Sequence, residues 1–366
     1  MTFLKEFKDR DLAGHLIQKI ASSSRKKIRI MEVCGTHTVS IFKSGIRSIL
    51  PDTISLLSGP GCPVCVTAQE EIDTFIAFSR MDDVIITTFG DLMRVPGTES
   101  SLQKEKAQGR DIRMVYSATD ALSIAQNNPD QQVIFLGVGF ETTAPTVAAV
   151  ILSAASMNLM NFHVYSAHKL VPPALFALMR LTARNINGFI LPGHVSVIIG
   201  VNGYLPFFNT YKIPCAIGGF DSVDILRAIL SLVEQIECDK PSLFNAYERA
   251  VKTEGNPKAM SLMDQVFEKK DALWRGIGQI PDSGLSIREA HASFDAANAF
   301  QIDLPEPKSS KECSCGEILI GNKTPPECPL FRKTCTPLNP FGPCMVSSEG
   351  TWATYYRFFD EQQTKR

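Results

Sequence analysis

The chain is organised around one stretch, Ser58-Gly59-Pro60-Gly61-Cys62-Pro63-Val64-Cys65-Val66-Thr67. An apolar run at 54–57 precedes it and an amphipathic pattern at 68–78 follows it, which predicts a strand, a tight turn and a helix that starts at the cysteines. Free N–H groups and the helix dipole favour the thiolate at a helix start. A CxxC motif placed there binds a soft metal, cycles between dithiol and disulfide, or does both. The alternative is that two small side chains simply fill a turn.

The strand-turn-helix pattern repeats from residue 28 onwards. Apolar runs that predict strands lie at 28–33, 54–57, 84–89, 114–117, 133–138, 162–166, 188–191 and 213–217. Continuous apolar strands that alternate with helices are typical of a parallel sheet covered on both faces. We therefore expect an α/β fold with two small parallel-sheet domains, at 28–130 and 131–222, facing each other across a cleft. The first of these contains Cys34, Cys62 and Cys65.

The remaining chain has a different composition. Helical spacing is expected at 242–251 and 258–267, and irregular chain around the glycines of 274–285. Beyond residue 311, six prolines separate five cysteines, which leaves little apolar material for a core. Metal ligation by thiolates can hold such a segment together. We expect residues 223–366, with the N-terminal helix in 1–27, to form an irregular iron–sulfur domain.

The bulk composition excludes several classes of partner. The 366 residues carry a net charge of −1, which argues against nucleic acid or an anionic membrane as a partner. No signal peptide is visible, and the longest stretch without charged residues, 142–168, is broken by Pro145 and polar residues. Ten cysteines without a secretory signal indicate a reducing, cytoplasmic compartment, where metal or redox roles are commoner than structural disulfides.

Polar and reactive side chains follow nearly every predicted strand. They are Cys34, His37, Cys62, Cys65, Asp91, Arg94, Glu141, Thr142, His168, His194 and Asp221. Ligands of open α/β sheets bind beyond the carboxyl ends of the strands, so we expect a site in the cleft. Each histidine, taken singly, could equally be a buried hydrogen-bonded residue. No GxGxxG or P-loop motif occurs, and catalytic Cys-His pairs are usually distant in sequence, unlike Cys34 and His37. Three thiols with a histidine at strand ends fit the capture of a soft metal or of iron, with thiol redox chemistry, better.

The C-terminal cysteines predict a second metal site. The candidates are Cys313, Cys315, Cys328, Cys335 and Cys344. Their spacing lacks the paired knuckles of structural zinc and favours a [4Fe–4S] cluster, which takes four thiolates. One cysteine is then spare, with Cys313 or Cys315 the ambiguous member. Cys215 and Cys238 have no partner at ligand spacing and are expected to be buried small residues.

Several long motifs resemble the hydrogenase maturation factor family HypD. In the first half they are Cys34-Gly35-Thr36-His37-Thr38, Gly59 to Cys65, Thr88 to Asp91 with Arg94 to Gly97, Gly139 to Pro145, and Pro192 to Ser196. In the tail they are Cys315-Gly316-Glu317 and Gly342-Pro343-Cys344-Met345-Val346-Ser347-Ser348-Glu349-Gly350. The match covers almost the whole chain, and motifs of this length and number are highly specific.

The resemblance implies a function, a fold and a set of sites. It implies a scaffold on which the Fe(CN)2CO group of [NiFe]-hydrogenase is assembled, in complex with the small chaperone HypC and with cyanide delivered by HypE, so that the hydrogenase large subunit is served indirectly. It implies iron held at or near Cys34, a redox pair at Cys62 and Cys65, and a C-terminal [4Fe–4S] cluster that feeds electrons towards that pair. This chain departs from the family at Trp352, where a cysteine is common, so any role of that thiol is absent here or taken by Cys313 or Cys315.

Our hypothesis is that the Cys34 thiolate binds Fe(II), which carries CN and CO ligands during assembly, and that His37 is a second ligand or a hydrogen-bond partner. Asp91, Glu141, Thr142 and His194 are expected to line the cleft as polar groups. One alternative is an iron–sulfur-dependent thiol/disulfide oxidoreductase that acts on an external disulfide. Another is a non-catalytic adaptor whose metal sites are structural.

Overall fold

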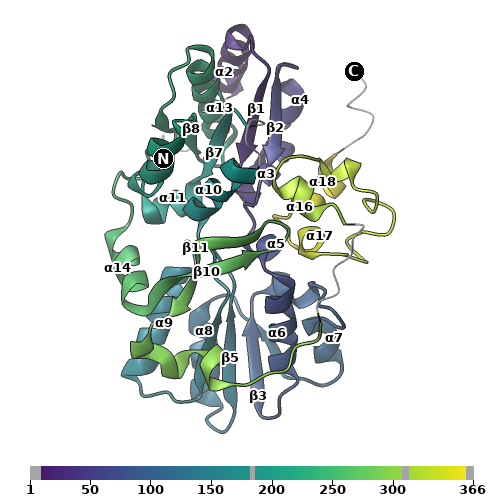
Figure 1. The fold of residues 1–366 in the computed structure, drawn as a ribbon, viewed down its shortest axis with the longest axis vertical. Coiled ribbons are helices and arrows are strands. Elements are labelled where there is room, and N and C mark those ends of the chain that lie inside the picture. The colour runs from purple at the N-terminus through teal and green to yellow at the C-terminus, as the bar shows by residue number, and fades with distance from the viewer. Residues whose placement is uncertain (1–9, 182–185, 307–312, 360–366) are drawn as a thin grey trace.

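The computed structural model describes residues 10–181, 186–306 and 313–359. It has two lobes, each built on its own parallel sheet, with a hairpin lying between them and a cysteine-rich segment at one side (Figure 1). The expected α/β class with parallel sheets is confirmed.

The first lobe holds a five-stranded parallel sheet in the order β2-β1-β7-β8-β9. Its strands are β1 (Ile28–Glu32), β2 (Ile54–Ser58), β7 (Gly188–Pro192), β8 (Cys215–Gly218) and β9 (Leu243–Asn245). One face is covered by α2 (Arg10–Ser23), α3 (Gly35–Lys43), α4 (Ile46–Ile49) and α13 (Ser222–Glu237). The other face packs against α10 (Val171–Leu181), α11 (Gly193–Ile199), η2 (Asn202–Tyr204) and α12 (Leu205–Tyr211). Because both faces are covered, the central strands are apolar throughout, as expected for a parallel sheet.

The second lobe holds a four-stranded parallel sheet in the order β4-β3-β5-β6. Its strands are β3 (Val84–Thr88), β4 (Ile112–Met114), β5 (Gln132–Gly137) and β6 (Phe162–Ser166). On one face lie α8 (Ala118–Asn127), α9 (Ala144–Ser156) and α14 (Pro257–Val266), and on the other α6 (Gln69–Ser79), η1 (Gly90–Arg94), α7 (Leu102–Ala107) and α15 (Ala296–Ala299).

The division into consecutive domains at 28–130 and 131–222 does not follow the sheets. The strands β7 and β8, from the expected second domain, belong to the first lobe, where β7 pairs with β1, and β3 and β4 lie in the other sheet with β5. The chain therefore crosses between the lobes after β2 and returns after β6. Strand periodicity predicts each strand but carries no information on its neighbours, which are set by tertiary packing.

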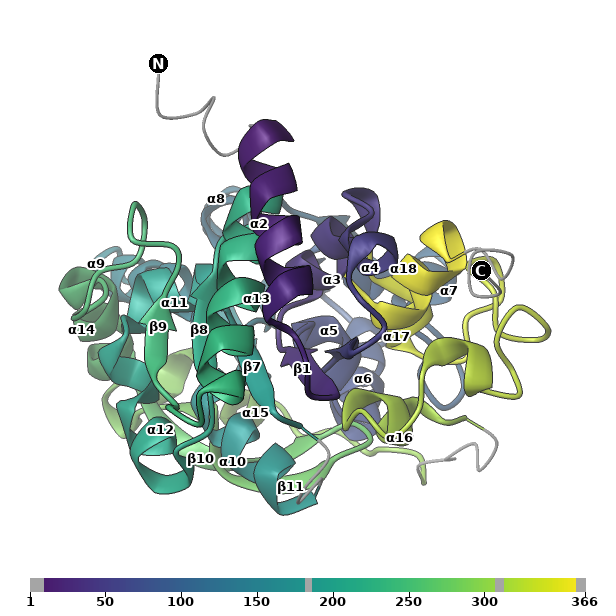
Figure 2. The ribbon, with the colours of Figure 1, turned by 90° about the horizontal axis from the view of Figure 1, so that it is seen from above.

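The segment 223–366 is not one domain, and the N-terminal helix is not part of the cysteine-rich region. Helix α2 lies beside α13 over the first sheet, where Leu16 and Ile20 are buried, and α16 to α18 lie elsewhere (Figure 2). An amphipathic helix buries its apolar face against the nearest complementary surface, and here that surface is α13.

Two further expectations between residues 242 and 285 are wrong. Residues 243–245 form β9, held to β8 by hydrogen bonds such as Ala246 N to Ile217 O at 3.0 Å, where a helix was expected. The glycine-rich stretch is the turn of an antiparallel hairpin, β10 (Phe267–Trp274) and β11 (Gly278–Ile287), followed by η3 (Glu289–Phe294). The hairpin supplies Trp274 to the core of the first lobe and Phe267 to that of the second, so it joins the two lobes.

The cysteine-rich segment contains only short elements. They are α16 (Cys315–Leu319), η4 (Pro325–Glu327), α17 (Pro343–Val346) and α18 (Thr351–Phe358). The segment packs against α3 and against α5 (Pro63–Val66), which is the short helix of the CxxC turn. No helix in the described ranges is long and apolar enough to cross a membrane.

Candidate thiol and metal site

Two thiol-bearing turns meet at the carboxyl ends of β1 and β2. Cys34 is the N-cap of α3, and Cys62 is the N-cap of α5. The backbone N–H of Gly35 donates to the carbonyl oxygen of Gly61 at 2.9 Å. A Cβ on Gly61 would run into the backbone of Cys34, so only glycine allows this approach. The strand order places β1 beside β2, and the glycines then bring the two turns into direct contact.

The Cys34 thiol is neutral in this environment. Burial raises its pKa to about 12, and the nearby carboxylate of Glu349 adds to the rise. The backbone N–H groups of His37 and Thr36 favour the thiolate, but desolvation outweighs them. A cation beside the sulfur would reverse this balance, because metal ligation requires the deprotonated form.

The CxxC thiols face the C-terminal cysteines. The Cys62 Sγ accepts a hydrogen bond from the Cys65 backbone N–H at 3.3 Å, which is a cap contact at the helix start. Cys65 is almost fully buried and packs in the same apolar cluster as Cys344 of α17. Burial is the main cause that raises the pKa of Cys65 well above its usual value. The CxxC turn is thus in contact with Cys34 through its backbone and with Cys344 through sulfur.

Sulfur contacts continue into the cysteine-rich segment. The Sγ atoms of Cys315 and Cys344 lie 3.4 Å apart. The neighbouring thiols of Cys315 and Cys65 lower the pKa of Cys344 to about 6, which favours its thiolate form. The neighbouring Cys315 thiol, together with burial, raises the pKa of Cys313. The result is a continuous series of contacts, Cys313 to Cys315 to Cys344 to Cys65.

The five C-terminal cysteines share one apolar environment. Cys328 and Cys335 pack with Cys344, Cys62 and Cys65 in a single buried cluster, with Cys313 and Cys315 against it. Apolar side chains surround the sulfurs: Ile318, Leu330, Phe331, Met345, Trp352 and Tyr355. Gathered thiols in an apolar shell are the donor set of an iron–sulfur cluster, so these residues fit that cofactor. Over the described ranges, no three His, Cys, Asp or Glu side chains converge as they would around a single metal ion.

Two histidines of the expected site both contact Phe220. The ring of His37 is fully buried, and its Nε2 donates to the carbonyl oxygens of Gly219 at 2.9 Å and Gly218 at 3.2 Å. Burial lowers the pKa of His37 to about 4, so the ring is neutral with its lone pair on Nδ1. His194 is exposed and stacks on Phe220 with ring centroids 4.0 Å apart. The observed contacts make His37 a link between α3 and the end of β8.

Two acidic side chains attach the cysteine-rich segment beside the thiols. Asp91, from η1 of the second lobe, accepts from the Ser347 hydroxyl at 2.9 Å. Glu349 accepts from the hydroxyl of Thr36, which follows Cys34 by two residues, at 2.6 Å. The segment 347–349 therefore bridges the two lobes at this site.

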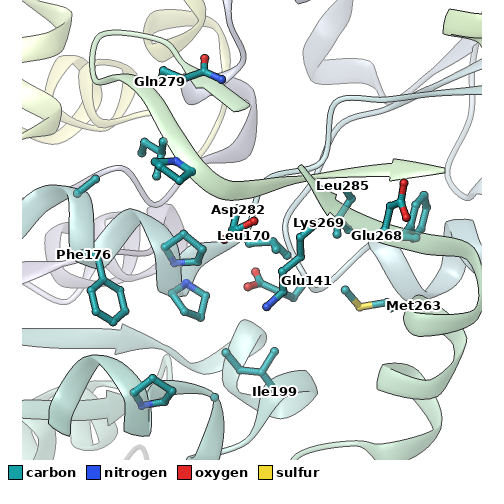
Figure 3. A pocket seen from close by; sticks show the side chains of 18 of the residues that line it. Glu141, Leu170, Phe176, Ile199, Met263, Glu268, Lys269, Gln279, Asp282 and Leu285 are labelled. Carbon is teal, nitrogen blue, oxygen red and sulfur yellow. The ribbon is translucent and has the colours of Figure 1, made fainter. Parts of the chain in front are cut away.

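Glu141 and Thr142 lie away from the sulfurs. Glu141 is buried, accepts from the Val171 backbone N–H at 2.9 Å and lines a pocket beneath the hairpin (Figure 3). Thr142 is half-buried next to it, before α9. Cys215 is fully buried in the first-lobe core as expected, whereas Cys238 at the end of α13 is exposed and not buried.

Three other polar residues at strand ends have structural contacts or face solvent. His168 is buried, and its Nδ1 hydrogen-bonds to the Ser166 hydroxyl at 3.1 Å. Asp221 accepts from the guanidinium of Arg249 at 3.2 Å. Arg94 is exposed at the end of η1. His168 is therefore a buried, hydrogen-bonded histidine, which is the alternative that the sequence left open for each histidine.

Arg275 is a contributor that the sequence did not indicate. Its backbone N–H donates to Val66 O at 2.9 Å, and its guanidinium donates to Thr67 O at 2.9 Å and Gln69 Oε1 at 2.8 Å. Its positive charge also favours the thiolate form of Cys315. The tip of the hairpin thus fastens the CxxC turn. The two glycines within residues 274–278 are a signal for a turn, but nothing in this run specifies that Arg275 contacts the CxxC turn.

The fold and the site define a class of protein: a two-lobed α/β chain that gathers a buried thiol at a strand end, a CxxC turn and a cysteine-rich segment. The sequence profile of the HypD family, described as the hydrogenase formation hypA family, matches residues 11–359. The hydrogenase maturation factor HypD of Azotobacter vinelandii is 42% identical over 372 residues, which cover 99% of this chain and 98% of that protein. HypD2 of Bradyrhizobium diazoefficiens is 43% identical over 100% of both chains, and HypD of Cupriavidus necator is 40% identical over 98% of this chain and 97% of its own. The chain belongs to the HypD family of hydrogenase maturation factors.

Proposed function

We propose that this chain is the scaffold and redox protein on which the Fe(CN)2CO group of [NiFe]-hydrogenase is assembled. The observation that carries the proposal is the junction of three thiol groups. The Cys34 turn contacts the CxxC turn through Gly61, and Cys65 contacts Cys344 of the cysteine-rich segment. This contact supports a role in which a thiol that holds iron acts beside thiols that store electrons.

Cys34 is the residue proposed to hold the iron as cargo. Its thiol is neutral, so binding of Fe(II) displaces one proton and replaces it with a metal–sulfur bond. The proposed partners are a HypC-type chaperone, which would complete the coordination of the iron, and a HypE-type donor of cyanide. Glu349 acts electrostatically on both Cys34 and His194, and neither Glu349 nor His194 is buried, so an incoming partner would meet them first.

The thiols of the CxxC turn are proposed to cycle. Two electrons and two protons convert a Cys62–Cys65 disulfide into the dithiol. A [4Fe–4S] cluster, held by four of Cys313, Cys315, Cys328, Cys335 and Cys344, supplies single electrons when it is bound. Cys344 touches both Cys65 and Cys315, which supports a role as the connection between cluster and turn.

The decisive experiment is anaerobic purification of the Cys34→Ala variant with its maturation partners, followed by infrared spectroscopy. The wild type is expected to show bands in the cyanide and carbonyl stretch region, and the variant none, while its cluster absorbance is unchanged. Cys215→Ala is the matched control, because that thiol is also buried but lies in β8. Full maturation by Cys34→Ala would refute the assignment of Cys34.

The second candidate function is a thiol/disulfide oxidoreductase that acts on an external substrate. The proximity of Cys65 in the CxxC turn to Cys344 favours it, since a cluster held by the C-terminal cysteines would reduce the Cys62–Cys65 pair through this contact. Turnover of a disulfide substrate by protein that never shows cyanide or carbonyl bands would support this function over the scaffold.

A further inference from the structure

A large pocket lies between the lobes, beneath the hairpin. Its volume is about 870 Å³, within the usual range for pockets that bind small ligands. It is formed by α10, the start of α12, α14 and the hairpin β10–β11 (Figure 3). Most of its wall is apolar: Leu170, Pro172, Phe176, Ile199, Met263, Phe267, Ile280 and Leu285.

The buried carboxyl group of Glu141 lies in this apolar wall, and over the ranges that the structure describes only one of its two oxygens has a hydrogen-bond partner. The Oε1 of Glu141 accepts from the Val171 N–H, while its Oε2 has no partner among the described residues. The residue is only 2% exposed. A buried oxygen left without a hydrogen bond is unfavourable, so a ligand that pairs with it would gain this contact.

The charges around the pocket favour a positive group. Four carboxyl side chains line it, against three basic ones. The acidic residues are Glu141, Asp264, Glu268 and Asp282, and the basic residues are Arg180, Lys269 and Arg288. Arg288 and Glu268 lie 3.8 Å apart and pair with each other, and Arg288 also donates to the carbonyl oxygen of Asp264, which leaves three carboxyl side chains against two basic ones. Lys269 is the cation that acts on Glu141, yet it leaves Oε2 unpaired.

We propose that this pocket binds a ligand with an apolar body and a basic nitrogen, whose N–H group donates to Oε2 of Glu141. The aromatic rings of Phe176 and Phe267 and the side chain of Met263 would pack against the apolar body. The same chemistry is offered by a small amine and by a lysine side chain flanked by apolar residues. This site goes beyond the proposed function and does not depend on it, because none of its lining residues is a cysteine.

The test is a calorimetric titration of the full-length protein with two probes. One is 2-phenylethylamine and the other is a Leu-Lys-Leu peptide with both ends blocked; 2-phenylethanol and the Leu-Gln-Leu peptide are their neutral counterparts. We expect saturable binding of at least one basic probe and at least tenfold weaker binding of its neutral counterpart. Tighter binding of 2-phenylethylamine would indicate a small amine as the ligand, whereas tighter binding of the Leu-Lys-Leu peptide would indicate a lysine side chain.

Two variants test the role of Glu141. Glu141→Gln keeps an acceptor for Val171 and removes the negative charge, and we expect at least tenfold weaker binding of the basic probe. Ala177→Trp, which fills the pocket from α10 and leaves Glu141 in place, should abolish binding. Glu289→Gln, which removes an exposed carboxylate outside the pocket lining, is the control and should change the affinity less than twofold.

The pH dependence of binding distinguishes a basic ligand, which pairs with the Glu141 carboxylate, from a ligand that accepts a hydrogen bond from the neutral carboxyl group. Burial raises the pKa of Glu141 to about 7, so the carboxylate needed by a cation forms as pH rises through that value, and binding should tighten from pH 6 to pH 8. A ligand that accepts a hydrogen bond from the neutral carboxyl would bind more weakly over the same range. Equal affinity of wild type and Glu141→Gln, or no saturable binding of either basic probe, would overturn the proposal.

Discussion

Gly35→Ala tests whether the close approach of the cysteine-rich segment to the Cys34 turn matters. A Cβ on Gly35 would lie 2.5 Å from the carbonyl oxygen of Glu349 and 2.7 Å from its Cβ. Ordinary van der Waals contact begins at 3.4 Å, so the segment must move away by about 0.9 Å. This movement would strain the 2.6 Å hydrogen bond between Thr36 and Glu349.

The expected change in the free energy of unfolding of Gly35→Ala combines two destabilising contributions and one stabilising contribution. Overpacking of a tight contact destabilises by about 1–3 kcal/mol, and loss of the hydrogen bond to a charged group by about 1.5–3 kcal/mol. Replacing glycine by alanine within a helix stabilises by about 0.5–1 kcal/mol, and Gly35 is the first residue of α3. These contributions sum to a net destabilisation of about 1.5–5.5 kcal/mol.

Gly14→Ala is the matched control. Gly14 lies within α2, and no atom lies within 4 Å of the place that a Cβ would take, so the same substitution should stabilise by about 0.5–1 kcal/mol. Urea unfolding followed by circular dichroism gives the two free energies, and alkylation of Cys34 detected by mass spectrometry reports how far the turn has opened. Gly35→Ala should lose stability and expose Cys34 to alkylation, whereas Gly14→Ala should do neither. Equal stability of the two variants, with equal protection of Cys34, would contradict the role given to this close approach.

Three further predictions concern the hairpin, the pocket and the cysteine cluster. Arg275→Gln removes the charged hydrogen bonds to Thr67 and Gln69, so Cys62 should be alkylated faster than in the wild type, and an unchanged rate would contradict the role of the hairpin tip. Burial raises the pKa of Glu141 from 4.5 to about 7, so its contribution to stability is present below pH 4.5 and is lost as pH rises through about 7. Urea unfolding at several pH values should show this slope in the wild type and its loss in Glu141→Gln. Trp352→Ala empties a buried site among the cysteines and should cost about 3–5 kcal/mol, measured as faster hydrogen exchange in α17 and α18 rather than in the sheets.

The strands of both sheets could be predicted from the sequence because a parallel strand that is buried on both faces consists of a short run of apolar residues. All eight predicted runs correspond to strands, although the fourth lies at 112–114 instead of 114–117. The short strand β9 was missed because its residues are only partly buried and it is fixed by pairing with β8, which lies 25 residues earlier in the chain at its nearest end.

Sheet membership could not be predicted, because the alternation of strands and helices is the same whether the chain stays in one lobe or crosses to the other. The same limit applies to the site. Cys34 and the CxxC turn were expected at neighbouring strand ends, and the glycine contact between them agrees with that expectation. Glu141 was expected to face them across the cleft from the other domain, yet the turn after β5 carries it to the pocket beneath the hairpin.

The position of the CxxC turn gives a direction to the proposed electron flow. The turn lies where the chain first crosses between the lobes, and its two neighbours meet it through different atoms. It meets the Cys34 turn through the backbone of Gly61, whereas it meets Cys344 through the sulfur of Cys65. Because electrons pass into a disulfide at its sulfur atoms, the contact with Cys344 is the one suited to reduction of the turn. Reduction from the side of the cysteine-rich segment would not involve the Cys34 sulfur, which would stay free to bind the proposed iron.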